Sequence, residues 1–201
     1  MGMGKTKSTR NRSKQRNKTK KTYSGQDYKS SDGFLTAVWG PMLWTYLHTM
    51  SFNYPDNPTA ANKRHYREFV LNLQNVMPCR FCRQNLTNNL KELPLTNNHM
   101  KNRESFSRYI YDLHETVNRM LNKKSGLTYA DVRDRYENFR SRCTKDDVPT
   151  KEEVKKEEAE KKEKGCTVPL YGKKSRCVIK IVPQEEKQET FQMDKKCIKH
   201  K

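Results

Sequence analysis

Long apolar runs are missing from this sequence of 201 residues, of which only 32% are hydrophobic. No stretch approaches the ~20 apolar residues that a helix needs to cross a bilayer. The basic N-terminus also leads into no apolar segment of the kind found in signal peptides. We therefore expect a protein that stays on the cytosolic side of membranes, where a Cys-x-x-Cys pair is more often catalytic or metal-binding than structural.

Acidic residues are also scarce, with 23 against 42 lysines and arginines and a formal net charge of +19. Residues 1–33 carry much of this positive charge and almost no aliphatic side chains, so we predict that they form a disordered basic arm. Both tryptophans and nearly all regularly spaced apolar residues lie within residues 34–143, which predicts a single folded domain. Residues 144–201 are predicted to form a charged linker and a cysteine-containing tail with one β-like run, CVIKIV.

Sustained alternation of apolar and polar residues, the pattern of strands, is absent from residues 34–143. Apolar residues recur there at helical spacing instead. They predict helices over 38–50 with Pro41 in the first helical position, from a Thr59 cap to Pro78, from Cys79 to about Leu90, and over 106–121 with Gly126 as the cap. Thr128 and Asp131 predict a capping box for a short fifth helix. The fold class is therefore all-α, a four-helix bundle with a short fifth helix.

The strongest chemical signal is PCRFC at residues 78–82, which places two thiols one helical turn apart at the start of a predicted helix. The free amides and the dipole of a helix N-terminus stabilise a thiolate. Arg80 and Arg83 add positive charge. We therefore predict that Cys79 is reactive and that Cys79 and Cys82 are the catalytic pair.

Two other interpretations of this pair stay open. Half a zinc site would need a second ligand pair, but Cys143, Cys166, Cys177 and Cys197 contain no second Cys-x-x-Cys. We therefore predict no metal site. A thioredoxin-like fold would need strands around the motif, and the sequence predicts none there.

Two further pairs of residues are spaced four apart on predicted helices, Trp44 with His48 and His114 with Asn118. A single Trp/His pair is usually core packing. Two polar-aromatic pairs that face the inside of a bundle need hydrogen-bond partners there. A flat heteroaromatic cofactor would supply both partners and a stacking surface.

Three segments carry a resemblance to a known family. WGPMLWTYLHTMSFNYP, NVMPCRFCRQNL and SFSRYIYDLHETVNRMLNKKSGLTYADVRDRY resemble, in order and spacing, the Trp-x-x-Leu-His, Cys-x-x-Cys and His-x-x-x-Asn motifs of the Erv/ALR sulfhydryl oxidase family. The resemblance covers nearly all of residues 38–143. The Trp-Gly-Pro opening and the Asn-Lys-Lys ending are most similar to versions encoded by nucleocytoplasmic large DNA viruses.

The resemblance implies an FAD inside the bundle, usually in a homodimer, with Cys82 facing the flavin ring. By matching positions, it implies that the cofactor-binding residues are Trp39, Gly40, Trp44 and His48 from the first helix, His114 and Asn118 from the fourth, Lys123 or Lys124 at the phosphates and Tyr136 on the adenine. Glu115 departs from the asparagine of many cellular members. Tyr129 stands where their second disulfide begins, which we interpret as subtype variation.

The same resemblance implies a reaction and its partners. A reduced protein thiol attacks Cys79, the cysteine pair passes two electrons to FAD, and oxygen is reduced to hydrogen peroxide. The viral character places the protein in the host cytoplasm, the virus factory or the virion. The alternative from another class is a basic protein that binds nucleic acid through phosphate contacts and holds zinc with its cysteines.

The flanks carry two further hypotheses. The start MGMGKT fits the N-myristoylation pattern and precedes a polybasic run, which together predict contact of the arm with a membrane surface. Family members often place an extra cysteine pair on a flexible segment as an electron shuttle, and Cys166 and Cys177 are the candidates, closing a loop with Gly172 at its middle. Incidental thiols or a local staple are the other interpretation of these two cysteines, and no role is assigned to Cys143 or Cys197.

Overall fold

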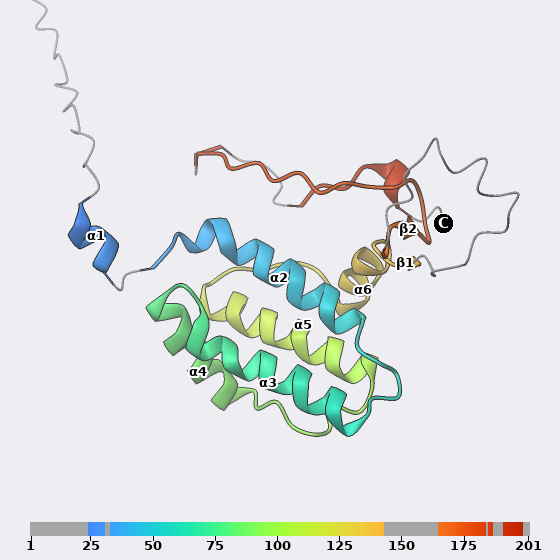
Figure 1. Ribbon diagram of the computed structural model, residues 1–201, viewed down its shortest axis with the longest axis horizontal. Coiled ribbons are helices and arrows are strands. Elements are labelled where there is room, and N and C mark those ends of the chain that lie inside the picture. The colour runs from blue at the N-terminus through green and yellow to red at the C-terminus, as the bar shows by residue number, and fades with distance from the viewer. Residues whose placement is uncertain (1–23, 31–32, 143–164, 184, 187–190, 199–201) are drawn as a thin grey trace, which may run out of the picture. The chain divides into compact units, whose positions relative to one another are not determined.

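The computed structural model describes residues 24–30, 33–142, 165–183, 185–186 and 191–198 (Figure 1). The described helices are α1 (Gly25–Lys29), α2 (Thr36–Phe52), α3 (Ala60–Val76), α4 (Arg80–Glu92), α5 (Arg103–Met120), α6 (Tyr129–Glu137) and a 3-10 helix, η1 (Lys195–Cys197). Strands β1 (Ser141–Arg142) and β2 (Val168–Pro169) pair antiparallel. The chain divides into two units, residues 1–31 and 32–201.

Helices α2 to α5 form the bundle, and α6 lies against α2 and α5 (Figure 1). The predicted all-α class, with four helices and a short fifth, is therefore confirmed. None of the helices in the described ranges is long and apolar enough to cross a membrane.

Two of the predicted helix starts are confirmed by their caps. The Thr59 hydroxyl accepts a hydrogen bond from the Asn62 amide at 3.1 Å, and the Thr59 amide donates to the Asn62 side chain at 3.0 Å. Thr128 and Asp131 make the same reciprocal pair at the start of α6. Such capping boxes satisfy amides that the first turn leaves without helical partners.

Two predicted boundaries are wrong. Helix α2 begins at Thr36, so Pro41 lies inside it rather than at its first position. Gly40 precedes the proline and has no Cβ to crowd the ring, which makes this proline easier to accommodate. Helix α5 ends at a Leu121 cap rather than at Gly126, because Asn122 takes the left-handed conformation with φ of 54°.

One prediction for the flanks also needs correction. Residues 25–29 of the arm form α1, because Ser24 and Asp27 make a capping box that the sequence analysis missed. The remaining arm residues, 1–23 and 31–32, lie outside the described ranges. The β-like run at 177–182, which is too short to fold alone, forms no strand, and the tail contributes β2 at another place.

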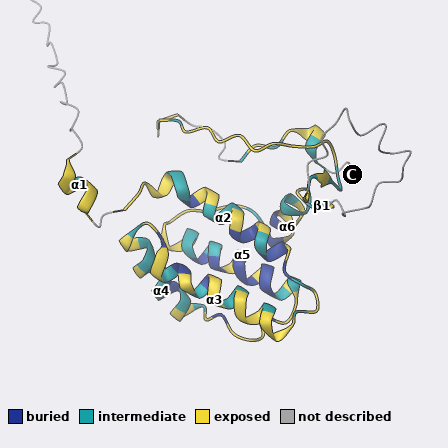
Figure 2. Cartoon of the chain, viewed as in Figure 1, coloured by how far each residue is buried: buried dark blue, intermediate teal, exposed yellow. Residues whose placement is uncertain are grey.

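The core lies between α2, α3, α4 and α5, where the apolar helix faces meet (Figure 2). Its fully buried side chains include Tyr54, Phe106, Tyr109, Ile110 and Leu113, each no more than 1% exposed. The two tyrosine hydroxyls stay satisfied, since Tyr54 donates to the Met100 carbonyl at 3.1 Å and Tyr109 to the Leu93 carbonyl at 3.0 Å.

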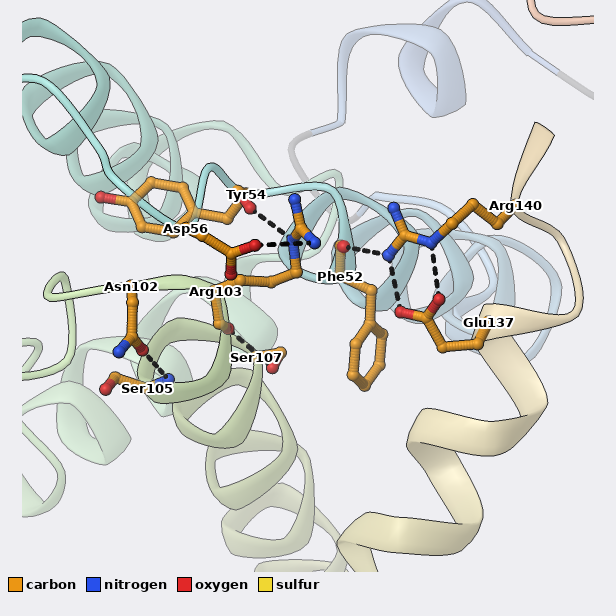
Figure 3. A network of polar contacts seen from close by, with 9 residues as sticks. All are labelled: Phe52, Tyr54, Asp56, Asn102, Arg103, Ser105, Ser107, Glu137 and Arg140. Carbon is orange, nitrogen blue, oxygen red and sulfur yellow. Dashed lines mark hydrogen bonds and ion pairs between the residues drawn. The ribbon is translucent and has the colours of Figure 1, made fainter. Parts of the chain in front are cut away.

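Two arginines bind the chain where it leaves α2 (Figure 3). Arg103 at the start of α5 donates to the Tyr54 carbonyl at 2.7 Å and pairs with Asp56 at 3.2 Å. Arg140, after α6, donates to the Phe52 carbonyl at 2.9 Å and forms a two-bonded ion pair with Glu137. These contacts hold the end of α2 against the start of α5 and against the end of α6.

The tail folds back on the end of α6. The Leu170 amide donates to the Arg140 carbonyl at 2.9 Å, which continues the β1–β2 pairing. The Lys173 amide donates to the Lys196 carbonyl at 2.8 Å, so η1 lies against the turn at Gly172. Gly172 has φ of 64°, and a Cβ there would come within 2.7 Å of that carbonyl oxygen.

Candidate redox and cofactor site

The Cys79–Cys82 pair forms a disulfide at the start of α4, with the two Cα atoms 5.2 Å apart. Cys79 is the N-cap residue, and its sulfur accepts a hydrogen bond from the Cys82 amide at 3.2 Å. Cys82 lies one turn further in and packs against the apolar core. The geometry therefore makes Cys79 the outer sulfur and Cys82 the inner one.

The N-terminal end of α2 lies over this disulfide. Gly33 forms a β-bridge with Cys79, and the Phe34 amide donates to the Pro78 carbonyl at 2.8 Å. Trp39, a predicted site residue, donates through Nε1 to the Phe34 carbonyl at 3.1 Å. Trp39 thus fixes the segment beside the disulfide, a role that the sequence analysis did not foresee. Gly40 is buried one position further along α2.

Four predicted site residues gather as a group of rings. The Trp44 and His114 rings stack with centroids 3.9 Å apart and planes 3° from parallel. The centroids of the His48 and Tyr136 rings are 5.0 Å apart, and Nε2 of His48 is 3.0 Å from Nδ1 of His114. Residues from α2, α5 and α6 therefore meet at one place, and Trp44 packs on the same core cluster as Cys82.

Burial controls the charge of this ring group. It lowers the pKa of His48 to about 3, with the nearby His114 adding to the effect. It lowers the pKa of His114 to about 4, although Glu115 opposes the shift. Burial also raises the pKa of Tyr136. The imidazoles are therefore neutral near pH 7, and the ring group carries no charge of its own.

Among the described residues, one buried polar atom of this ring group has no hydrogen-bond partner. His48 is 2% exposed, and its Nδ1 makes no hydrogen bond in the described part of the chain. Leaving such an atom unpaired costs roughly 1–3 kcal/mol. A flat heteroaromatic molecule would offer it a partner and would offer the stacked rings a surface, so these residues fit such a cofactor.

The remaining predicted cofactor residues follow the ring group along the chain. The Asn118 amide group donates to the Glu115 carboxylate at 2.8 Å. Its backbone carbonyl accepts from the Lys123 amide at 2.8 Å, which turns the chain sharply after α5. Lys123 and Lys124 are both exposed beyond this turn. Their charges are free to meet an anionic group in solution.

The predicted pairing of Cys166 with Cys177 is wrong. Cys166 is disulfide-bonded, whereas Cys177 is an exposed free thiol and Cys197 is a second free thiol. The physical reason is local: β-pairing ties residues 168–170 to the end of α6, and the Ser141 hydroxyl donates to the Cys166 carbonyl at 3.0 Å. This pairing directs Cys166 toward the end of α6 rather than along the tail. Cys143 lies outside the described residues.

The sequence did not predict one neighbour of the ring group. Phe191 of the tail lies 6.5 Å from the Tyr136 ring and 5.9 Å from the Phe139 ring, with the Arg135 guanidinium 4.9 Å from its own ring. A lone phenylalanine in a polar tail is the only signal that could have indicated this contact.

Metal ligation finds no support in the ranges that the structure describes. No group of three or more histidine, cysteine, aspartate or glutamate side chains there is arranged to hold a metal ion. The zinc-holding alternative therefore has no ligand set among these residues.

Comparisons with known proteins find relatives of this chain. The profile of the Erv1 / Alr family matches residues 41–137. A probable FAD-linked sulfhydryl oxidase of Acanthamoeba polyphaga mimivirus is 36% identical over 47% of this chain, which spans 65% of that relative's length. An FAD-linked sulfhydryl oxidase of African swine fever virus is 32% identical over 49% of this chain and 80% of the relative. A crystal structure of the FAD binding domain of Erv1 from Saccharomyces cerevisiae, 25% identical, covers 48% of this chain and 89% of that one with a TM-score of 0.44.

Proposed function

We propose that this chain, which belongs to the Erv1/Alr family, is an FAD-dependent thiol oxidase that forms disulfides in reduced protein substrates and reduces oxygen to hydrogen peroxide. One structural observation supports this function above the others. A disulfide at a helix start and a buried ring group with an unpartnered His48 Nδ1 pack on the same core.

The cysteine pair carries the thiol chemistry. A substrate thiolate attacks Cys79, the outer sulfur, and forms a mixed disulfide that a second substrate thiol resolves. Cys79 suits this role because it lies at the helix end, where free amides favour negative charge on sulfur. Substrate leaves with a disulfide, and Cys79 and Cys82 are left as a dithiol.

FAD, when bound, supplies the electron chemistry that takes two electrons from the dithiol and delivers them to oxygen. By their place around the disulfide and the ring group, Trp39, Gly40, Trp44 and His48 would line the flavin, His114, Asn118 and Tyr136 would contact the nucleotide, and Lys123 or Lys124 would meet the phosphates. The Trp44 and His114 rings would orient the bound cofactor, and the buried, neutral His48 would keep charge away from it.

Spectroscopy of the purified protein tests this function. We expect a yellow protein with about one FAD per chain that consumes oxygen and releases hydrogen peroxide when a dithiol is added. A colourless, folded protein that binds zinc stoichiometrically would sink the proposal in favour of the metal-binding alternative.

A homodimer is the proposed assembly. Exposed apolar side chains gather on α2 and α3, where Tyr46 is 55% and Phe69 39% exposed and their rings lie 5.8 Å apart. Met42 and Val76 are also exposed on these helices. In a two-fold dimer the same surface of each copy meets its equivalent, so the exposed apolar side chains of this face would cover one another. Sedimentation of Tyr46→Glu should show a shift from dimer to monomer, and an unchanged dimer would exclude this face.

The N-terminal arm is proposed to contact a membrane surface in the host cytoplasm, the virus factory or the virion. The support is the MGMGKT start and the polybasic run that follows it, all of which lie outside the described residues. Intact mass of the protein made in its native host cell tests the lipid anchor, and an unmodified N-terminus would refute it.

A further inference from the structure

The Thr36 hydroxyl lies next to the inner sulfur of the disulfide. Its Oγ1 is 3.6 Å from Sγ of Cys82, within hydrogen-bond distance for sulfur. Thr36 is the first residue of α2, while Cys82 is in the first turn of α4, so the contact joins two helix starts.

The segment that carries Thr36 is held beside the disulfide by backbone pairing. Gly33 bridges Cys79, and the Phe34 amide donates to the Pro78 carbonyl. Within the segment, the Trp39 indole donates to the Phe34 carbonyl and fixes its shape. Gly33 has φ of 101°, and a Cβ there would come within 2.3 Å of the Pro78 oxygen. A side chain at this position is therefore excluded, and the close approach places Thr36 over Cys82.

We propose that Thr36 is a positioning residue that stabilises Cys82 as the leaving thiolate when the Cys79–Cys82 disulfide is reduced. The inference rests on the proposed function for the direction of attack. A bond forms between the substrate sulfur and Cys79, and the bond between Cys79 and Cys82 breaks. Cys82 departs with the electron pair, and no proton has to move because the substrate attacks as a thiolate.

The hydroxyl suits this role because its strength as a donor depends on the charge of the sulfur. A neutral disulfide sulfur is a weak acceptor, whereas a thiolate accepts a charge-assisted hydrogen bond that is roughly twice as strong. Thr36 therefore favours the reduced pair over the oxidised one. Leu35, the N-cap of α2, makes no side-chain cap bond, so the positive end of that helix adds to the effect.

Reduction of the full-length flavoprotein by dithiothreitol under anaerobic conditions tests the inference. Acid quenching, alkylation and peptide mass spectrometry follow the Cys79–Cys82 disulfide separately from the free thiols of the tail. We expect Thr36→Val to slow reduction by about three- to tenfold and to shift the equilibrium with dithiothreitol toward the disulfide. Thr36→Ser should restore both values, because it keeps the hydroxyl.

Two controls separate the hydroxyl from the shape of the helix. Thr49→Val changes another exposed threonine of α2, one whose hydroxyl donates to the Thr45 carbonyl at 2.8 Å, and should react like wild type. Gly33→Ala should slow reduction like Thr36→Val, because it displaces the segment that positions the hydroxyl. Wild-type reactivity of Thr36→Val, or serine behaving like valine, would overturn the role of the hydroxyl.

A second readout reports charge on Cys82 directly. In Cys79→Ser, serine keeps a capping side chain and leaves Cys82 as a free thiol whose iodoacetamide alkylation rate rises with the thiolate fraction. Adding Thr36→Val should move this rate profile to higher pH, and an unmoved profile would count against the inference. Neither readout uses oxygen or turnover, so its failure is distinguishable from failure of the proposed oxidase function.

Discussion

His48 and His114 share one hydrogen bond, with Nε2 of the first 3.0 Å from Nδ1 of the second. Because burial keeps both rings neutral, one nitrogen of this pair donates and the other accepts. The choice sets the free Nδ1 of His48: it accepts if Nε2 carries the hydrogen, and it donates if Nε2 accepts. The pair can therefore adjust to either kind of cofactor atom.

Replacing His48 should weaken flavin binding. His48→Ala removes the unpartnered Nδ1 and leaves His114 without its buried partner, so we expect FAD affinity to fall about tenfold. Fluorescence titration of the flavin-free variant measures this change. His65→Ala on the exposed surface of α3 is the matched control and should bind like wild type.

Stability should fall in weak acid because of the same two histidines. Their pKa values are lowered by folding, so the unfolded chain binds more protons between the unfolded value of 6.5 and the folded values of about 3 and about 4. Stability is complete above pH 6.5 and is lost as the pH falls toward those folded values. The loss is at most about 1.4 kcal/mol per pH unit for each histidine.

Thermal unfolding of the flavin-free protein at several pH values measures this loss. His114→Phe keeps a flat ring at the Trp44 stack and should flatten the dependence between pH 6.5 and pH 4. An equal slope in this variant and in wild type would assign the acid sensitivity to other groups.

Cys82 should be needed for turnover but not for cofactor retention. Cys82→Ser removes the inner sulfur at a half-buried position and keeps a residue of similar size, so the flavin should stay bound while oxygen consumption with dithiothreitol stops. Cys177→Ser removes an exposed free thiol and should keep its rate on that reagent. Residual turnover in Cys82→Ser would argue for a second redox pair.

Periodicity alone predicted the helices well, because the buried faces of α3 and α5 repeat at helical spacing and their caps are local. Pro41 and Gly126 misled the prediction, since the residues that set the true ends, Thr36 and Asn122, show no strong local signal. The ring group was indicated by the spacing of Trp44 with His48. The contact of Thr36 with Cys82 joins residues 46 positions apart, and no local pattern reports such a distance.

Arg140 should stabilise the attachment of α6. Arg140→Met removes the bonds to the Phe52 carbonyl and to Glu137, both partly buried, and should lower the free energy of unfolding by about 1–2 kcal/mol. The melting temperature should fall by about 4–8 °C per kcal/mol for a domain of this size. Arg133→Met is the control: it breaks only a solvent-exposed ion pair with Asp134 and should change the melting temperature little.

The tail cysteines can be tested as an electron shuttle without cutting the chain. Truncation after residue 143 would also remove the contacts of residues 170 and 191 with the end of α6. Because Cys166 is disulfide-bonded and Cys177 is a free thiol, the relay is tested at Cys166: if the tail relays electrons, Cys166→Ser should keep the rate on dithiothreitol, which reaches Cys79 directly, and lose most of the rate on a reduced protein. Loss on both substrates, or on neither, would rule the relay out, and Cys197→Ser serves as the control.

The bridge between Gly33 and Cys79 also sets where a useful shortened version of this protein can start. The family match begins at residue 41, yet the chain that borders the reactive sulfurs begins eight residues earlier. A fragment cut at the family boundary would lose Thr36, the Phe34 bond to Pro78 and the first turn of α2. Such a fragment could fold and still give misleading rates, so kinetic work should keep the residues from 33 onward.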